Sequence, residues 1–147
     1  MADLSGTAKR TVMGLDYGQV TVGVAVSDAL GLTAVGLETI WRNSENKLRR
    51  TLARIKELAE EHQVGLIVVG LPVHMDGSVG ERAEYALEFG KKVAQRTSLP
   101  VVWQDERLTT YEAREILLQE GIDPKDHKKH LDRIAAALIL QDYMDSH

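Results

Sequence analysis

The spacing of hydrophobic positions changes near residue 48, and this change predicts two kinds of structure. Before it, residues 11–16 form an apolar segment, residues 21–27 alternate valines with small residues, and residues 35–41 form a third short segment. Alternation with a period of two is typical of strands, and the turns between these segments are short. We therefore expect the first part of the chain to form an antiparallel three-strand meander.

After residue 48, segments with helical spacing alternate with short apolar runs. The predicted helices begin near residues 48, 81, 109 and 131, and the predicted strands cover residues 65–70 and 100–104. A run that is apolar throughout, such as residues 65–70, is typical of a parallel strand buried on both faces. This order predicts an α/β fold with a mixed five-stranded sheet, made of the meander plus two parallel strands, flanked by helices. Trp41 and Trp103 lie in predicted strands, so we expect both to pack in the core.

Composition narrows the class of protein. The 147 residues suit one domain, which we place at residues 11–144, after a short flexible lead-in at residues 1–10. The absence of cysteine excludes disulfides, a thiol nucleophile and a cysteine zinc site. No apolar run approaches the roughly 18 residues of a membrane span, and the start lacks the apolar core of a signal peptide. We therefore expect a protein that does not enter a membrane, and the absence of cysteine is compatible with a reducing cytoplasm without proving it.

Acidic residues stand at three predicted junctions. Asp16 ends the first strand and precedes Tyr17-Gly18, the pair Asp105-Glu106 follows the fifth strand, and Asp132 opens the last helix. Each has an ordinary structural interpretation, such as a hairpin turn, a solvated loop or a favourable helix N-terminus. However, the carboxyl ends of parallel strands meet at one sheet edge, where ligands of open α/β sheets usually bind. Grouped carboxylates there would suit Mg²⁺, which prefers oxygen ligands, while the spacing leaves open which acid of the pair takes part.

Several further residues near these junctions are candidates for contacts with a phosphate. Gly18 leaves room for a phosphate to approach the backbone, and Arg107 offers a guanidinium fork. His74 lies in the long loop after residue 70, although an isolated loop histidine is more often merely exposed, as we also expect for His127 and His130. Despite the net charge of −4, one compact basic run lies beside Asp132, and a solvated surface is its default interpretation. The run consists of Lys125, Lys128, Lys129 and Arg133.

Six segments in one order resemble a known family over residues 11–143. They are Asp16-Tyr17-Gly18, Gly23-Val24-Ala25-Val26-Ser27-Asp28, Val69-Gly70-Leu71-Pro72, Met75-Asp76-Gly77-Ser78, Asp105-Glu106-Arg107-Leu108-Thr109-Thr110 and Leu131-Asp132-Arg133-Ile134-Ala135-Ala136. The chain resembles YqgF, the RuvX-type pre-16S rRNA nucleases, which are Holliday junction resolvase-like members of the RNase H-like fold.

The resemblance implies a site, a cofactor and partners. It implies that Asp16, Glu106 and Asp132 are the catalytic acids and bind one or two Mg²⁺ or Mn²⁺ ions. It also implies a cytoplasmic nuclease that matures the 5′ end of pre-16S rRNA, with pre-rRNA and ribosomal precursor particles as partners. Two positions depart from the family pattern, because Val20-Thr21 replaces a basic pair and His74 replaces an asparagine. Both departures leave the choice of substrate open.

Other functions remain compatible with the residues. One is a Holliday junction or branched-DNA resolvase, and another is a non-catalytic nucleic-acid-binding factor in ribosome assembly. The Asp-x-Gly hairpin also occurs in actin-like phosphotransferases, although these usually need two such domains and a longer chain. No helix is apolar all round, so we expect a monomer or a weak homodimer.

Overall fold

A five-stranded mixed sheet forms the centre of the computed structural model, which describes residues 11–72, 80–106 and 109–147 and gives only the backbone of residues 109–113 and 128–129. The strands are β1 (Thr11–Tyr17), β2 (Thr21–Ser27), β3 (Ala34–Trp41), β4 (Val64–Pro72) and β5 (Val101–Glu106). Their order in the sheet is β3-β2-β1-β4-β5. β1 pairs antiparallel with β2, and β2 with β3, whereas β4 runs parallel to both β1 and β5. The predicted meander and the two parallel strands are confirmed.

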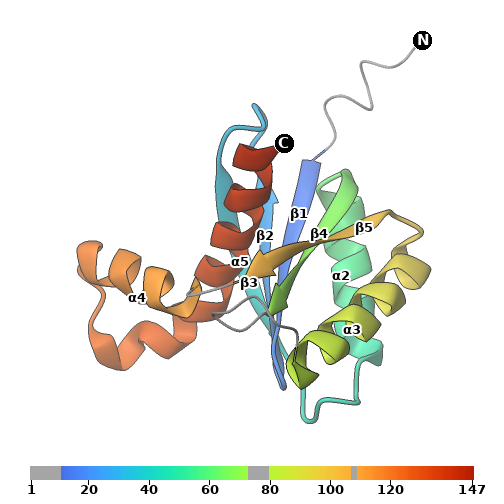
Figure 1. The fold of residues 1–147 in the computed structure, drawn as a ribbon, viewed down its shortest axis with the longest axis horizontal. Coiled ribbons are helices and arrows are strands. Elements are labelled where there is room, and N and C mark those ends of the chain that lie inside the picture. The colour runs from blue at the N-terminus through green and yellow to red at the C-terminus, as the bar shows by residue number, and fades with distance from the viewer. Residues whose placement is uncertain (1–10, 73–79, 107–108) are drawn as a thin grey trace.

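Helices cover both faces of the sheet (Figure 1). On one face lie α2 (Arg49–Glu61) and α3 (Glu81–Thr97), which also pack against each other. On the other face lies α5 (His127–Ser146), which contacts all five strands. The helix α4 (Thr109–Gln119) packs against α5 and extends away from the sheet.

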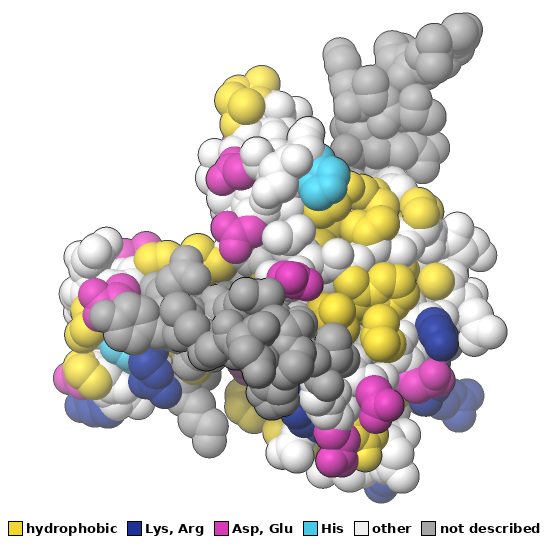
Figure 2. Space-filling model, viewed as in Figure 1, with side chains coloured by type: hydrophobic (Ala, Val, Ile, Leu, Met, Phe, Trp, Pro, Cys, Tyr) yellow, Lys and Arg dark blue, Asp and Glu magenta, His cyan; other side chains and the backbone are white. Residues whose placement is uncertain are grey.

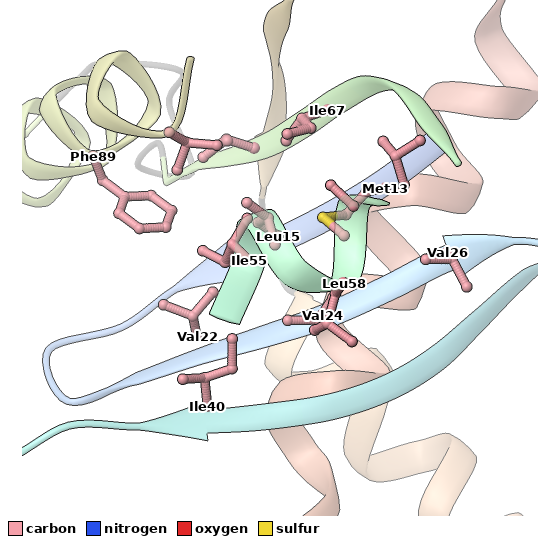
Figure 3. Close-up of a cluster of buried hydrophobic side chains, with 14 of the residues drawn as sticks. Met13, Leu15, Val22, Val24, Val26, Ile40, Ile55, Leu58, Ile67 and Phe89 are labelled. Carbon is pink, nitrogen blue, oxygen red and sulfur yellow. The ribbon is translucent and has the colours of Figure 1, made fainter. Parts of the chain in front are cut away.

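The core has two parts because strand side chains alternate between the two faces. Between the sheet and the helices α2 and α3, Figure 3 shows a cluster that includes Leu15, Val24, Ile55 and Phe89. A smaller cluster on the α5 face includes Ala25, Val68, Ala136, Ile139 and Leu140. The alternation predicted for residues 21–27 is confirmed, since the valines of β2 enter the first cluster and Ala25 enters the second.

Four glycines let α5 lie directly on the sheet. Gly14, Gly23, Gly36 and Gly70 stand on four adjacent strands, and a Cβ atom built on each would lie 3.0 Å or less from an atom of α5. Glycine within a strand commonly marks such a close approach of another backbone. The four glycines therefore set the depth at which α5 sits, and α5 carries Asp132.

The last helix begins earlier than predicted, at His127 rather than near residue 131. The Asp123 side chain accepts a hydrogen bond from the backbone N–H of Lys125, which starts a short 3₁₀ turn (Pro124–Asp126) that leads into α5. His127 is buried, and its Nε2 lies 3.1 Å from the backbone oxygen of Ile122. Our expectation that His127 is exposed is wrong. Because α5 begins at His127, Asp132 lies in the second turn of this helix.

Within the described ranges, every helix is too short or too polar to cross a membrane.

Candidate active site

Asp16 lies one residue before the end of β1 and faces α5. Its neighbours Leu15 and Tyr17 pack in the opposite cluster, with the Tyr17 ring stacked on Phe89 of α3 at a centroid distance of 4.6 Å. Asp16 pairs with Gly23 of β2, and directly paired residues project to the same side of a sheet. The carboxylate is therefore directed to the face on which α5 lies.

Gly23 brings the backbone of Asp132 down beside Asp16. A Cβ atom on Gly23 would lie only 1.9 Å from the backbone oxygen of Asp132, so glycine is the residue that lets α5 sit at this depth. The helix turn that carries Asp132 thus rests on the strand next to Asp16. These two segments are more than 100 residues apart in the chain, and the contact at Gly23 is the tightest of the close approaches that bring them together.

Glu106 reaches the same place from the other side. It is the last residue of β5 and pairs with Pro72 at the end of β4. A Cβ atom on Gly70 would lie 3.0 Å from Glu106 Oε2, so the carboxylate lies over the space that this glycine leaves. There it makes a side-chain hydrogen bond with Asp16. Asp105, the other acid of the pair, is exposed.

The two touching carboxyl groups perturb each other's protonation. Burial raises the pKa of Asp16 well above its ordinary value, and the charge of Glu106, the hydrogen bond with it and the charge of Asp132 raise that pKa further. Burial also raises the pKa of Glu106; the hydrogen bond with Asp16 opposes this shift, and the charge of Asp132 adds to it. Two half-buried carboxyl groups in contact cannot both ionise easily without a cation. This pair therefore has the donor chemistry and the excess negative charge that fit a hard divalent cation.

Asp132 is close enough to act electrostatically but does not complete a ligand set in this conformation. Among the described residues, no group of three acidic or histidine side chains is arranged to hold one ion together. The structure thus brings Asp16 and Glu106 into contact and leaves the half-buried Asp132 side chain as their neighbour.

Of the remaining predicted site residues, the structure describes Gly18, Lys125 and Arg133 with their side chains or backbone contacts. Gly18 is fixed in its turn: its N–H donates to Thr21 O (2.7 Å) and its carbonyl accepts from Arg42 Nη2 (2.6 Å). Lys125 is exposed, and the Arg133 guanidinium contacts His130 Nδ1. His74 and Arg107 lie outside the described residues, as do the side chains of Lys128 and Lys129.

Sequence reasoning missed the structural roles of Gly23 and Gly70. Both lie within predicted strands, and both flank Asp16 in the sheet, on β2 and β4 respectively. A glycine inside a strand is itself a signal of close approach, so the two positions were detectable. The sequence does not show which group approaches each glycine, because this depends on the packing of α5 and on the direction of the Glu106 side chain.

The meander-plus-parallel sheet, with its carboxyl pair at the ends of β1 and β5, defines a member of the RNase H-like class. Solved structures with this fold include Thermus thermophilus RuvC in complex with a Holliday junction substrate, at a TM-score of 0.60 and 18% identity over 93% of this chain and 94% of that one. The fowlpox virus Holliday junction resolvase matches at a TM-score of 0.52 and 15% identity, over 92% and 98%.

The family follows from the sequence. A model named RuvX and described as Holliday junction resolvase matches residues 10–146, so the chain belongs to the RuvX family of nucleases. A protein of Lachnospira eligens named "Putative pre-16S rRNA nuclease" is 50% identical over 92% of this chain and 96% of its own length. Proteins of the same name from Agathobacter rectalis and Lactiplantibacillus plantarum are 49% and 47% identical. The expected family is confirmed.

Proposed function

We propose that this chain is a divalent-metal-dependent nuclease that cleaves phosphodiester bonds in the maturation of the 5′ end of pre-16S rRNA. The observation that supports the metal dependence is the half-buried, touching pair Asp16 and Glu106 at the edge of the sheet. The names of relatives at 46% to 50% identity support pre-16S rRNA as the substrate.

Asp16 and Glu106 would hold Mg²⁺ or Mn²⁺, and Asp132 would join them as a third ligand. The close contact with Gly23 holds the backbone of Asp132 beside β2, so we propose that only its side chain moves to join the pair. When bound, one or two such ions lower the pKa of an attacking water and stabilise the leaving oxygen. The chain's own contribution is to place two carboxylates in a half-buried position, where water competes weakly for the cation.

The basic run would supply the electrostatic contact with a phosphate backbone. Lys125 is exposed, and Figure 2 shows basic side chains over the region of α4 and the start of α5, with acidic ones among them. Together with Lys128, Lys129, Arg133, Arg107, His74 and Gly18, this region is where we place the substrate strand. We also propose that the protein works in the cytoplasm on pre-rRNA or ribosomal precursor particles, as a monomer or weak homodimer.

A cleavage assay tests the proposal directly. Labelled pre-16S rRNA fragments and branched DNA are incubated with Mg²⁺, Mn²⁺ or EDTA, using wild type, Asp16→Asn, Glu106→Gln and Asp105→Asn. We expect cleavage only with metal, its loss in the Asp16 and Glu106 variants, and its retention in Asp105→Asn, because Asp105 is exposed and outside the touching pair. Full cleavage by Asp16→Asn with saturating Mn²⁺ contradicts the mechanism. Binding of RNA without cleavage by wild type supports a non-catalytic assembly factor instead.

A second candidate function is resolution of branched DNA, which the description of the family model favours. Depletion of the protein in its host separates the two. Small-subunit rRNA with an unprocessed 5′ extension supports rRNA maturation. Mature 5′ ends together with accumulating branched DNA support a resolvase.

A further inference from the structure

A pocket of about 480 Å³ opens on the α3 side of the sheet edge. Its lining includes Gln19, Glu45, Pro72, Arg82 and Tyr85. Volumes of this size are typical of sites for small ligands. Most of the lining comes from the turn after β1, the end of β4 and the first turns of α3, elements that meet at the edge where Asp16 and Glu106 lie.

The guanidinium of Arg82 is held in one orientation at this pocket. Its Nη1 lies 2.9 Å from Glu45 Oε2 and donates to Glu45 Oε1 at 3.2 Å. Glu45 is in turn fixed by the Tyr17 hydroxyl, which donates to Oε2 at 2.7 Å. The guanidinium carbon lies 5.7 Å from the centre of the Tyr17 ring and 5.1 Å from that of Tyr85. An arginine that is fixed in advance loses less conformational entropy when it binds a planar anionic group.

Among the described residues, the ion pair with Glu45 engages only Nη1 of Arg82. The guanidinium therefore retains donors for a ligand, and phosphate is the group that its fork matches. Next to it, the Tyr85 ring is 44% exposed and offers an aromatic surface. A charged fork beside an exposed ring is the combination that binds single-stranded nucleic acid, with the phosphate on the arginine and the base on the ring.

The pocket lies at the same edge of the sheet as the carboxyl pair, on the α3 side rather than the α5 side. Pro72, which lines it, pairs directly with Glu106 across β4 and β5, and Gln19 follows Asp16 by three residues. Tyr17 joins the two places, since it follows Asp16 in β1 while its hydroxyl holds Glu45. A strand cleaved at the carboxyl pair would thus continue naturally over the sheet edge into the pocket.

The acidic side chains of α3 limit where a phosphate can lie. Glu81, Glu84 and Glu88 line a neighbouring surface of the helix together with Tyr85, and Glu81 also lines the Arg82 pocket. Repulsion from these carboxylates disfavours a phosphate beside them, so the Arg82 guanidinium is the favourable position for a phosphate within the pocket.

From this arrangement we propose that the pocket at Arg82 and Tyr85 is a subsite for one unpaired nucleotide that flanks the scissile phosphodiester. Arg82 takes the backbone phosphate, and the base stacks on Tyr85. The assignment rests on the proposed nuclease function. It deepens that function by requiring a single-stranded segment next to the cleavage point.

Binding measurements test the subsite separately from catalysis. Fluorescence anisotropy of a labelled single-stranded RNA oligonucleotide, in Ca²⁺ to suppress cleavage, is recorded against salt for wild type, Arg82→Gln, Tyr85→Leu and Arg96→Gln. Arg96 lies in the last turn of the same helix and serves as a charge-matched control. We expect Arg82→Gln to weaken binding. It should also make the slope of log affinity against log salt concentration less negative by about 0.7, the value for one lost phosphate contact on a single strand. Tyr85→Leu should weaken binding roughly tenfold with an unchanged slope, because stacking carries no charge.

A small diester distinguishes a subsite from a disturbed metal site. Bis(p-nitrophenyl) phosphate has no flanking nucleotides, so Mn²⁺-dependent hydrolysis of it should fall much less in Arg82→Gln and Tyr85→Leu than RNA binding does. Oligonucleotide binding at wild-type affinity in both variants overturns the subsite, and so does an equal loss of small-diester hydrolysis and RNA binding in Arg82→Gln. If wild type hydrolyses neither RNA nor the small diester while the variants still show the binding pattern, the proposed nuclease function fails and the role beside the cleavage point fails with it, while nucleotide binding at Arg82 and Tyr85 stands. Thermal unfolding of each variant, with Arg82→Lys as a charge-retaining version, verifies that the fold is intact.

Discussion

Replacing Gly23 by alanine should separate Asp132 from Asp16 without touching either carboxylate. The new Cβ atom would lie 1.9 Å from the backbone oxygen of Asp132, whereas real Cβ atoms essentially never approach closer than 3.0 Å. The atoms in conflict are backbone on both sides, so no side chain can rotate out of the way. Either α5 rises from the sheet or β2 bends away from it.

The size of the required displacement follows from those two distances and is at least about 1 Å. A misplacement of about 1 Å among groups that act together can cost on the order of 100-fold in rate. We therefore expect Gly23→Ala to lower metal-dependent cleavage by about two orders of magnitude and to weaken Mn²⁺ binding. The fold should survive, because the buried clusters on both faces of the sheet lose no side chain.

Gly36→Ala provides a matched control. Gly36 lies on β3 under the same helix, but its Cβ atom would lie 3.0 Å from the backbone oxygen of Arg133, which a shift of a few tenths of an ångström relieves. Cleavage rate, Mn²⁺ affinity and circular dichroism are measured for both variants and wild type. If Gly23→Ala cleaves and binds Mn²⁺ as well as Gly36→Ala does, the close contact with α5 does not position the site.

Three further predictions follow from buried groups. Burial and Glu106 raise the pKa of Asp16 above its ordinary 3.8, so at pH values between the unfolded and the folded pKa the folded protein keeps a proton that the unfolded chain releases. In EDTA, the free energy of unfolding of wild type should therefore fall as the pH rises from about 3.8 through the raised pKa. Asp16→Asn removes the part of this loss that comes from Asp16, so the melting temperature of the variant relative to wild type should rise with pH; a constant difference refutes the raised pKa of Asp16. Thr51→Val should stabilise the protein by about 1 kcal/mol in urea unfolding, since the buried Thr51 hydroxyl has no hydrogen-bond partner among the described residues; a loss of stability would show that the hydroxyl does have such a partner. Gly90→Ala should destabilise by about 1–3 kcal/mol despite the better helix propensity of alanine, because its Cβ would lie 2.6 Å from Trp103 Cζ2; unchanged or higher stability would show that the Trp103 ring moves aside.

The elements with strong periodicity were predictable from sequence. The alternation of residues 21–27 predicted a strand with the bounds that β2 has in the structure. The apolar run from residue 65 predicted a parallel strand, and β4 is parallel to both of its neighbours. The start of α5 was missed because residues 123–130 are polar and resemble a loop. Their helical conformation depends on the Asp123 turn and on burial of His127, which are local contacts that periodicity does not report.

Trp41 shows why burial could not be predicted from strand membership alone. It ends β3, an edge strand, and is 58% exposed, so our expectation of core packing is wrong. Trp103 on β5 does pack against the core, with its ring against Gly90 of α3. β5 is also an edge strand, so the difference comes from α3, which covers Trp103, and this cover is a property of the tertiary structure.

For the candidate site, the topology predicted that the ends of β1 and β5 lie at one edge, and this is confirmed. The pattern could not choose between Asp105 and Glu106, because the direction of each side chain depends on how the last residues of β5 meet β4. The structure directs Glu106 over Gly70 and leaves Asp105 exposed. The contact between Asp16 and Glu106 therefore needed coordinates.

If a cation binds as proposed, the seating of α5 on the glycines of the sheet would link the lifetime of the folded state to the supply of cations. Without a cation, negative charge on Asp132 opposes that on Asp16 and Glu106, and it does so at the point where α5 rests on Gly23. A cation shared between α5 and the sheet would be released whenever that helix detaches, so it adds to the free energy of local unfolding, by about 2.7 kcal/mol at 100 times its dissociation constant. Since α5 contacts all five strands, its detachment would expose the Ile139 and Leu140 cluster as well as dismantling the carboxylates. Scarcity of divalent ions would then shorten the survival of this protein against proteases, in addition to slowing its chemistry.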